Sequence, residues 1–202
     1  IVEVLPGTIT RELKDAVAAH GLFYPPDPTS EPECSIGGNV ATNASGARSF
    51  RWGMTARWIE GLEVVTGTGE VHRFHRRSVD KNTAGYRPLL DPVELFIGCE
   101  GTLAVITRVW CRLTTDPGPA VSCIIFLETL DDALALTVAF RQRKLAAAPR
   151  CCDLLGKLAL DLLANHDRPP SIPANASAAL YVEFDAEEEI EDLLEHAIMP
   201  LA

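Results

Sequence analysis

The stretch from Cys34 to Arg48 constrains this chain more than any other, because nearly all of its residues are small or carry a side-chain amide. It reads Cys-Ser-Ile-Gly-Gly-Asn-Val-Ala-Thr-Asn-Ala-Ser-Gly-Ala-Arg. Such residues bury little apolar surface of their own, but they let the backbone approach another group closely. The stretch therefore predicts a loop built around a partner.

A second glycine turn follows further along the chain, at Gly98-Cys99-Glu100-Gly101-Thr102. The glycines of both segments can expose backbone N–H groups that bind an anion, and Asn39, Thr42 and Asn43 add hydroxyl and amide groups. Two ordinary tight turns are the alternative. Neither segment has the glycine spacing of a dinucleotide Rossmann site or of a P-loop. The residues suit a ligand that carries phosphates and carbonyls.

Periodic patterns surround the two segments. The sequence predicts strands over 1–5, 59–66, 70–74 and 103–113, a short apolar element over 93–97, a helix from a Thr10 cap to Gly21, an extended segment over 22–28 and irregular chain over 76–92. The alternation over 103–113 predicts that the odd-numbered residues from Leu103 to Leu113 share one face of the strand.

The run Thr114-Thr115-Asp116-Pro117-Gly118-Pro119 is the best linker candidate. Beyond it the patterns predict strands over 121–127, 151–155 and 179–184 that alternate with helices over 131–143, 158–165 and 187–196. Alternating strands and helices indicate a separate small α+β domain. We therefore divide the chain into domains at 1–115 and 120–202.

Composition excludes several classes of protein. With 47% hydrophobic residues in 202 and a formal net charge of −10, the chain is typical of a folded domain and unsuited to nucleic acid. The apolar runs are too short to span a membrane, so we expect a cytoplasmic protein. The six cysteines are interpreted as reduced thiols, and without C-x-x-C or H-x-x-x-H spacing no metal site is expected.

Four motifs occur in a fixed order. They are Pro25-Pro26-Asp27-Pro28-Thr29-Ser30, Gly37-Gly38-Asn39-Val40-Ala41-Thr42-Asn43-Ala44-Ser45-Gly46, Trp52-Gly53-Met54-Thr55 and Leu95-Phe96-Ile97-Gly98-Cys99-Glu100-Gly101-Thr102-Leu103-Ala104-Val105-Ile106-Thr107. Together they closely resemble the FAD-binding domain of the FAD-linked 2-hydroxy-acid dehydrogenases and oxidases, the glycolate oxidase and D-lactate dehydrogenase group. The resemblance covers about residues 1–113 and continues more weakly to the end.

The resemblance implies an α+β fold: the second part of a PCMH-type FAD-binding domain, mostly antiparallel sheet with flanking helices, followed by the start of an α+β cap domain. It implies non-covalently bound FAD that takes a hydride from a small 2-hydroxy acid such as glycolate or D-lactate. The residues that it places along the cofactor are Pro25, Pro26, Asp27, Pro28, Ser30, Gly37, Gly38, Asn39, Ala41, Thr42, Asn43, Gly46, Gly53, Thr55, Glu100, Gly101 and Ile106. The last three approach the adenosine end.

Catalytic residues are not identified, because in this family His, Arg and metal-binding residues of the later cap handle the substrate. The family's pyrophosphate loop lies upstream of the point that matches Ile1, so we expect this chain alone to bind FAD weakly or not at all and to be inactive. An electron-acceptor protein or a quinone is a possible partner. The chain departs from the family at Trp52, Cys99 and Ala104, where Tyr, Ser and Gly are usual.

Two other functions stay open. The first is a non-catalytic, truncated or degenerate module that acts through partner binding. The second is a reductase of the UDP-sugar type with the same FAD fold, which is disfavoured because the first and last motifs resemble the hydroxy-acid group more closely.

Overall fold

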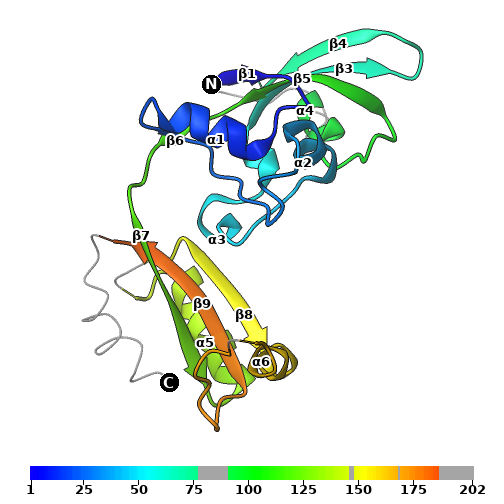
Figure 1. The fold of residues 1–202 in the computed structure, drawn as a ribbon. Coiled ribbons are helices and arrows are strands. Elements are labelled where there is room, and N and C mark those ends of the chain that lie inside the picture. Colours follow the sequence, from blue (N-terminus) through cyan, green and yellow to red (C-terminus); the bar gives the residue numbers. More distant parts are fainter. Residues whose placement is uncertain (77–90, 146–147, 168, 187–202) are drawn as a thin grey trace. The chain divides into compact units, whose positions relative to one another are not determined.

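The computed structural model describes residues 1–76, 91–145, 148–167 and 169–186, which fall into two compact units, Ile1–Asp116 and Pro117–Ala202. Each unit is described by itself (Figure 1). The first contains β1 (Val2–Val4), α1 (Thr10–Ala18), β2 (Leu22–Phe23), α2 (Ile36–Thr42), α3 (Ser49–Trp52), a 3-10 turn (Thr55–Trp58), β3 (Ile59–Thr66), β4 (Val71–His75), α4 (Pro92–Phe96), β5 (Ala104–Cys111) and β6 (Thr114–Thr115).

The first unit is built on an antiparallel sheet with the strand order β1-β5-β3-β4. In Figure 1, α1, α2 and α4 lie on one side of this sheet. Side chains from these helices and from β3 and β5, together with Tyr24 directly after β2, form one buried core: Leu13, Val17, Tyr24, Ile36, Val40, Ile59, Leu62, Val64, Val93, Phe96, Ala104, Val109 and Cys111. The predicted α+β class with a mostly antiparallel sheet is confirmed, as is the predicted hairpin of β3 and β4.

Helix α1 begins at Thr10 and is preceded by Ile9, so the prediction that Thr10 caps this helix is wrong. The backbone N–H and the Oγ1 hydroxyl of Thr10 both donate to the carbonyl oxygen of Cys34, at 2.9 and 3.2 Å. A hydrogen bond to a distant segment thus takes the hydroxyl that a cap would direct at its own helix.

Helix α2 (Ile36–Thr42) forms the first half of the stretch that we predicted as a loop, so the prediction is wrong for these residues. Ser35 caps the helix, its Oγ accepting the N–H of Gly38 at 3.2 Å, and Ile36 and Val40, one turn apart, are fully buried. The two glycines disfavour a helix by up to about 1 kcal/mol each. Burial of two aliphatic side chains against the sheet offsets this cost.

Strand β5 does not keep one alternation along its length. The pairing with β3 shifts between Glu63 and Val64, and Thr107 is the extra residue on β5. Ala104 is buried before this β-bulge and Val109 after it, so even-numbered residues face the core first and odd-numbered residues afterwards. The prediction of one uninterrupted face is wrong, because a β-bulge reverses the phase of a strand.

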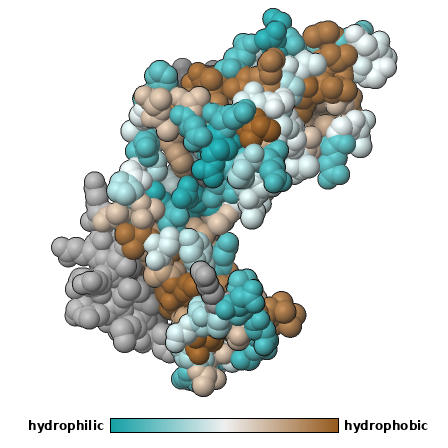
Figure 2. Space-filling view, viewed as in Figure 1, coloured by the Kyte–Doolittle hydropathy of each residue, from teal (hydrophilic) through white to brown (hydrophobic). Residues whose placement is uncertain are grey.

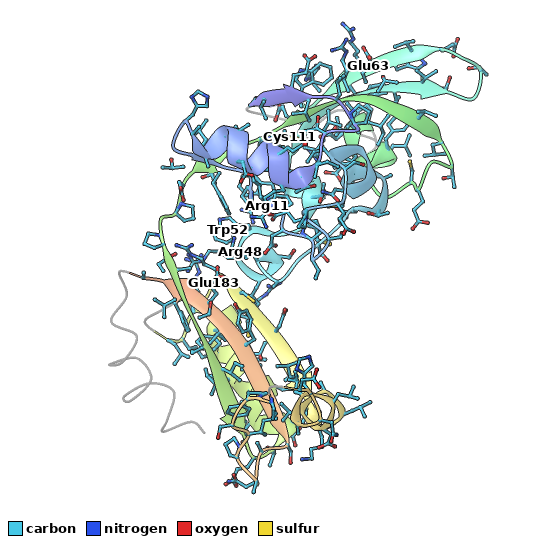
Figure 3. All side chains as sticks on the ribbon, viewed as in Figure 1. Arg11, Arg48, Trp52, Glu63, Cys111 and Glu183 are labelled. Atoms are coloured by element: carbon cyan, nitrogen blue, oxygen red, sulfur yellow. The ribbon has the colours of Figure 1, made fainter. Side chains whose placement is uncertain are left out.

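Charged side chains lie across the opposite face of this sheet, one from each strand. Glu3 on β1 pairs with Arg108 on β5 at 2.6 Å, Arg108 with Glu63 on β3 at 3.5 Å, and Glu63 with Arg73 on β4 at 2.5 Å. Figure 3 shows Glu63 on this outer face and Cys111 on the helix side. The hydrogen bonds that Arg73 and Thr107 donate to Glu63 lower the pKa of this carboxyl group.

The second unit is a three-stranded antiparallel sheet with the order β7-β9-β8. Its elements are β7 (Ala120–Leu127), α5 (Leu130–Arg141), β8 (Cys151–Gly156), α6 (Lys157–Ala164) and β9 (Ala178–Asp185). The Phe140 ring of α5 packs edge-on against Phe184 of β9, with ring centroids 5.8 Å apart. The strands and helices predicted up to residue 184 are confirmed within one or two residues at each end.

The first residues of the predicted linker belong to the first unit, and its last residues are bound to the second unit. Thr114 and Thr115 form β6, which pairs with β2. The guanidinium of Arg150, which is 3% exposed, donates to the carbonyl oxygens of Pro117, Gly118 and Pro119 at 2.9–3.0 Å and pairs with Asp185 at 2.5 Å. A buried arginine therefore fixes the first residues of the second unit.

The helix predicted over 187–196 and most of the irregular segment over 76–92 lie outside the described residues. Among the helices that are described, none has both the length and the apolar character that crossing a bilayer requires.

Candidate functional site

The two glycine segments meet directly in the structure. The N–H of Gly98 donates to the carbonyl oxygen of Val40, and the N–H of Glu100 donates to that of Ala41, both at 2.9 Å. Three residues of the turn have left-handed backbone conformations, with φ of 76° at Gly98, 49° at Glu100 and 75° at Gly101. The last turn of α2 and the turn before β5 therefore form one continuous surface.

A groove of about 430 Å³ lies where α2, the turn before β5 and the turn after β1 come together. Its lining consists of Pro6, Gly7, Ser35, Gly37, Gly38, Ala41, Gly101, Ala104, Val105 and Ile106. None of these side chains is charged and only one carries a hydroxyl, so the groove fits a flat, largely apolar part of a ligand. Five lining residues belong to the predicted cofactor set: Gly37, Gly38, Ala41, Gly101 and Ile106.

Sequence reasoning missed the other five lining residues. In the sequence, Pro6 and Gly7 only mark a break after the strand predicted over 1–5, but in the structure a Cβ on Gly37 would come within 2.5 Å of the Pro6 Cβ. The N–H of Gly37 also donates to the Pro6 carbonyl oxygen at 2.8 Å. The sequence gives little sign that Pro6 and Gly7 line a groove, because only the tertiary structure brings this turn next to the start of α2.

Val105, which lines the groove, is also open to solvent, with 67% of its surface exposed. It pairs with Val65, which pairs on its other side with Val71, and Val71 is 61% exposed. Figure 2 shows hydrophobic side chains gathered over this end of the sheet, where β4 starts and β5 enters.

The predicted anion-binding amides are mostly occupied by the protein itself. The N–H groups of Gly37, Gly38, Gly98 and Glu100 donate to Pro6, Ser35, Val40 and Ala41. The prediction that these amides are open is wrong, because one of them closes a helix cap and three make hydrogen bonds between segments. The N–H of Gly101 has no hydrogen-bond acceptor among the described residues, and no atom lies within 4 Å of the position that a Cβ on Gly101 would take.

Asn39 lies in the interior and not in the groove. It is 3% exposed, and its Nδ2 donates to Oγ1 of Thr10 at 2.7 Å. Because Thr10 is the first residue of α1, this hydrogen bond joins α2 to α1. The Thr10 hydroxyl in turn donates to the Cys34 carbonyl oxygen. Burial argues against direct contact between the Asn39 side chain and a cofactor.

Several of the remaining predicted residues lie in or beside a second loop, between α2 and α3. Asn43, with φ of 48°, accepts the N–H of Ala56 through Oδ1 at 2.9 Å. Thr55 is buried and donates through Oγ1 to the Ala44 carbonyl at 2.7 Å. Three of the predicted residues, Ser30, Thr42 and Glu100, are exposed. Gly53 is half-buried, with φ of 76°. The three prolines of the Pro-rich motif, Pro25, Pro26 and Pro28, are buried.

Trp52 lies beside this loop, and Figure 3 labels it near Arg48. Its ring packs edge-on against Phe23 at 5.4 Å, with the guanidinium of Arg51 over it at 5.5 Å. The backbone carbonyl of Trp52 accepts the indole N–H of Trp58 at 3.0 Å. The Trp52 ring therefore makes its contacts within the first unit. These contacts use the aromatic face and edge and do not involve the hydroxyl that a Tyr would carry at this position.

Tyr24, directly before the Pro-rich motif, is fully buried, and its hydroxyl makes no hydrogen bond in the part of the chain that the structure describes. Burial raises the pKa of Tyr24 well above its ordinary value, and it raises the pKa of the neighbouring Cys111 to about 12. Both groups are neutral near pH 7 and act as core residues. Among the described residues, no three His, Cys, Asp or Glu side chains are placed to bind a metal ion.

Comparison with known proteins agrees with this geometry. Residues 1–75 match the family described as FAD binding domain. The chain is 33% identical over 204 residues to D-lactate dehydrogenase of Anaerostipes hadrus, covering 98% of this chain and 41% of that protein. It is 33% identical over 182 residues to glycolate oxidase subunit GlcD of Bacillus subtilis (90% and 37%), and 40% identical over 138 residues to D-2-hydroxyglutarate dehydrogenase of Xanthomonas citri pv. viticola (68% and 28%).

The fold is also found in solved structures. Alkyldihydroxyacetonephosphate synthase matches with a TM-score of 0.71 at 18% identity, over 98% of this chain and 37% of that one. The chain thus spans less than half the length of these relatives. Over residues 1–75 the chain thus resembles the FAD-binding domain family, and over longer stretches it is similar to D-lactate dehydrogenase, a glycolate oxidase subunit and D-2-hydroxyglutarate dehydrogenase.

Proposed function

We propose that the full-length protein is an FAD-dependent oxidoreductase that oxidises a small 2-hydroxy acid, such as glycolate or D-lactate, to the 2-oxo acid, and that this chain forms part of its flavin pocket. One observation carries the proposal: Gly37-Gly38 and Gly101, from segments far apart in sequence, line a single groove in a domain that resembles the FAD-binding family. The names of the relatives support the substrate class.

The groove would hold a ring system of FAD between the start of α2 and the start of β5. Gly37, Gly38 and Ala41 would contact one side, and Gly101 and Ile106 the other. Small side chains allow the backbone to reach the ligand, and the apolar lining excludes water from it. The lining contains no His or Cys that could form a covalent bond to a cofactor, which suits non-covalent binding.

When bound, FAD supplies the hydride acceptor. The residues of this chain hold and orient it, and none of the groove side chains is suited to remove a proton from the substrate alcohol. We expect the substrate-binding and catalytic groups outside the groove, in the cap domain, and an electron-acceptor protein or a quinone as a further partner.

The test fills the groove in the full-length protein. Ala41→Leu places a larger side chain on the α2 wall, while the Ala41 carbonyl that accepts Glu100 is retained. Ala16→Leu is the matched control, an exposed alanine in α1 that lines no part of the groove. We expect Ala41→Leu to weaken FAD binding at least tenfold, about 1.4 kcal/mol, measured by flavin fluorescence titration.

The wild-type and Ala16→Leu proteins should bind FAD equally and be bleached anaerobically by a 2-hydroxy acid. A wild-type protein that takes up no flavin contradicts the proposal and favours the non-catalytic module. Equal affinities for wild type and Ala41→Leu would mean that FAD does not occupy this groove.

A further inference from the structure

The carboxylate of Asp27 joins two segments that are separate in sequence. Its Oδ1 and Oδ2 accept the backbone N–H of Arg48, at 3.3 and 3.4 Å, and Oδ2 lies 3.8 Å from Nε of the same arginine. Asp27 belongs to the Pro-rich motif, whereas Arg48 ends the loop that follows α2. The acid thus ties this loop to a segment of buried prolines.

Gly46, in the loop after α2, lies directly against Asp27. A Cβ on Gly46 would overlap the backbone carbonyl and the carboxylate of Asp27, so no other residue fits there without displacing the acid. The N–H of Gly46 donates to Oγ of Ser49 at 2.9 Å, and the N–H of Ser49 donates back to the Gly46 carbonyl at 2.9 Å. The loop is therefore shaped around Asp27.

The other end of this loop is fixed as well. The Ala44 carbonyl accepts both the N–H and the Oγ1 hydroxyl of Thr55, at 3.1 and 2.7 Å, and Asn43 accepts the N–H of Ala56. Residues 44–48 thus run between two fixed points, and the Asp27 carboxylate is the fixed point at the far end.

Contact between a carboxylate and FAD would be unfavourable near its phosphates, because like charges repel. Both oxygens of Asp27 instead face the N–H of Arg48, whose guanidinium offsets the charge. We propose that Asp27 is a positioning residue for the flavin, which holds the loop at residues 44–48 through its bond to the Arg48 N–H and does not itself contact the cofactor. This inference rests on the proposed function.

The test compares Asp27→Ala and Asp27→Asn in the full-length protein. The asparagine keeps an acceptor for the Arg48 N–H, whereas the alanine has none. The matched control is Glu31→Ala, because Glu31 lies on the same segment but pairs with Arg11 and Lys14 of α1. The readouts are the FAD dissociation constant, the visible absorption spectrum of the bound flavin, its midpoint potential and the unfolding midpoint of the apoprotein.

We expect Asp27→Ala to weaken FAD binding at least tenfold and to shift the visible band and the potential, while Asp27→Asn stays within threefold of wild type. Glu31→Ala should lower the unfolding midpoint and leave the flavin spectrum unchanged. If Asp27→Ala does not fold, Gly46→Ala serves instead, since its methyl group displaces both the backbone carbonyl and the carboxylate of Asp27 and should shift the spectrum at least as far.

The inference is overturned if Asp27→Ala, or Gly46→Ala in its place, retains the wild-type flavin spectrum and affinity. It is also overturned if Asp27→Asn is as impaired as Asp27→Ala, because the hydrogen bond would then not carry the effect. In both cases wild type still binds FAD, so the proposed function stands. A wild-type protein without flavin refutes the proposed function itself.

Discussion

Nδ2 of Asn39 donates to Oγ1 of Thr10 across 2.7 Å, with both residues buried. This hydrogen bond joins the helix that lines the groove to the helix that precedes it, and it gives Asn39 a structural role within a motif that the sequence associates with cofactor binding.

We therefore expect Asn39→Ala and Thr10→Val each to lower the free energy of unfolding by about 1–3 kcal/mol, because each leaves a buried polar partner unsatisfied. The double variant should cost less than the sum of the singles, by at least about 0.5 kcal/mol. Urea unfolding followed by tryptophan fluorescence measures this, since Trp52, Trp58 and Trp110 all lie in the first unit. Strictly additive costs would show that the two side chains are not coupled.

Replacing Arg150 should lower the stability of the second unit and leave that of the first unit unchanged. Arg150→Met keeps the length of the side chain but leaves Asp185 and three carbonyl oxygens without their buried guanidinium, which we expect to cost about 3–5 kcal/mol. The far-UV circular dichroism transition should gain an earlier phase, while the tryptophan transition of the first unit keeps its midpoint.

The matched control for this variant is Lys157→Met, which removes a cation that is 58% exposed and pairs with Asp161 one turn along the same helix. An exposed pair contributes about 0–1 kcal/mol, so both transitions should stay near wild type. A single unchanged dichroism transition in Arg150→Met would contradict the role given to the arginine.

Glu63 predicts a pH dependence of the first unit. Hydrogen bonds from Arg73 and Thr107 lower its pKa in the folded state, so its stabilising effect is present above the pKa of the unfolded chain and is lost as the pH falls through the lower, folded value. Glu63→Gln should be less stable than wild type at pH 7, and the difference should shrink as the solution is acidified below about pH 4. Urea midpoints by tryptophan fluorescence test this.

Glu3→Gln is the control for Glu63, because Glu3 ends the same row of charges and its side chain is 46% exposed. Its effect should be smaller at every pH. A Glu63→Gln difference that stays constant between pH 7 and pH 3 would show that the charge of Glu63 is not the cause.

The sequence alone predicts the strands of the four-stranded and three-stranded sheets, the hairpin of β3 and β4 and the resemblance to a flavoprotein family, but not the short strands β2 and β6. Alternation of apolar side chains and the Gly-rich turn at residues 67–69 act over a few residues, so these features are local. The four motifs also named five residues of the groove, because only small side chains leave room for a ligand there.

The remaining features depend on packing between segments that are distant in sequence. Gly37 and Gly38 disfavour a helix locally, but Ile36 and Val40 form one because the sheet buries them. Pro6 and Gly7 line the groove only because Gly37 lets α2 come close, and Asn39 faces inward because Thr10 supplies its partner. The sequence lists the residues able to approach one another, whereas packing between distant segments determines which approaches are made and which polar groups remain for a ligand.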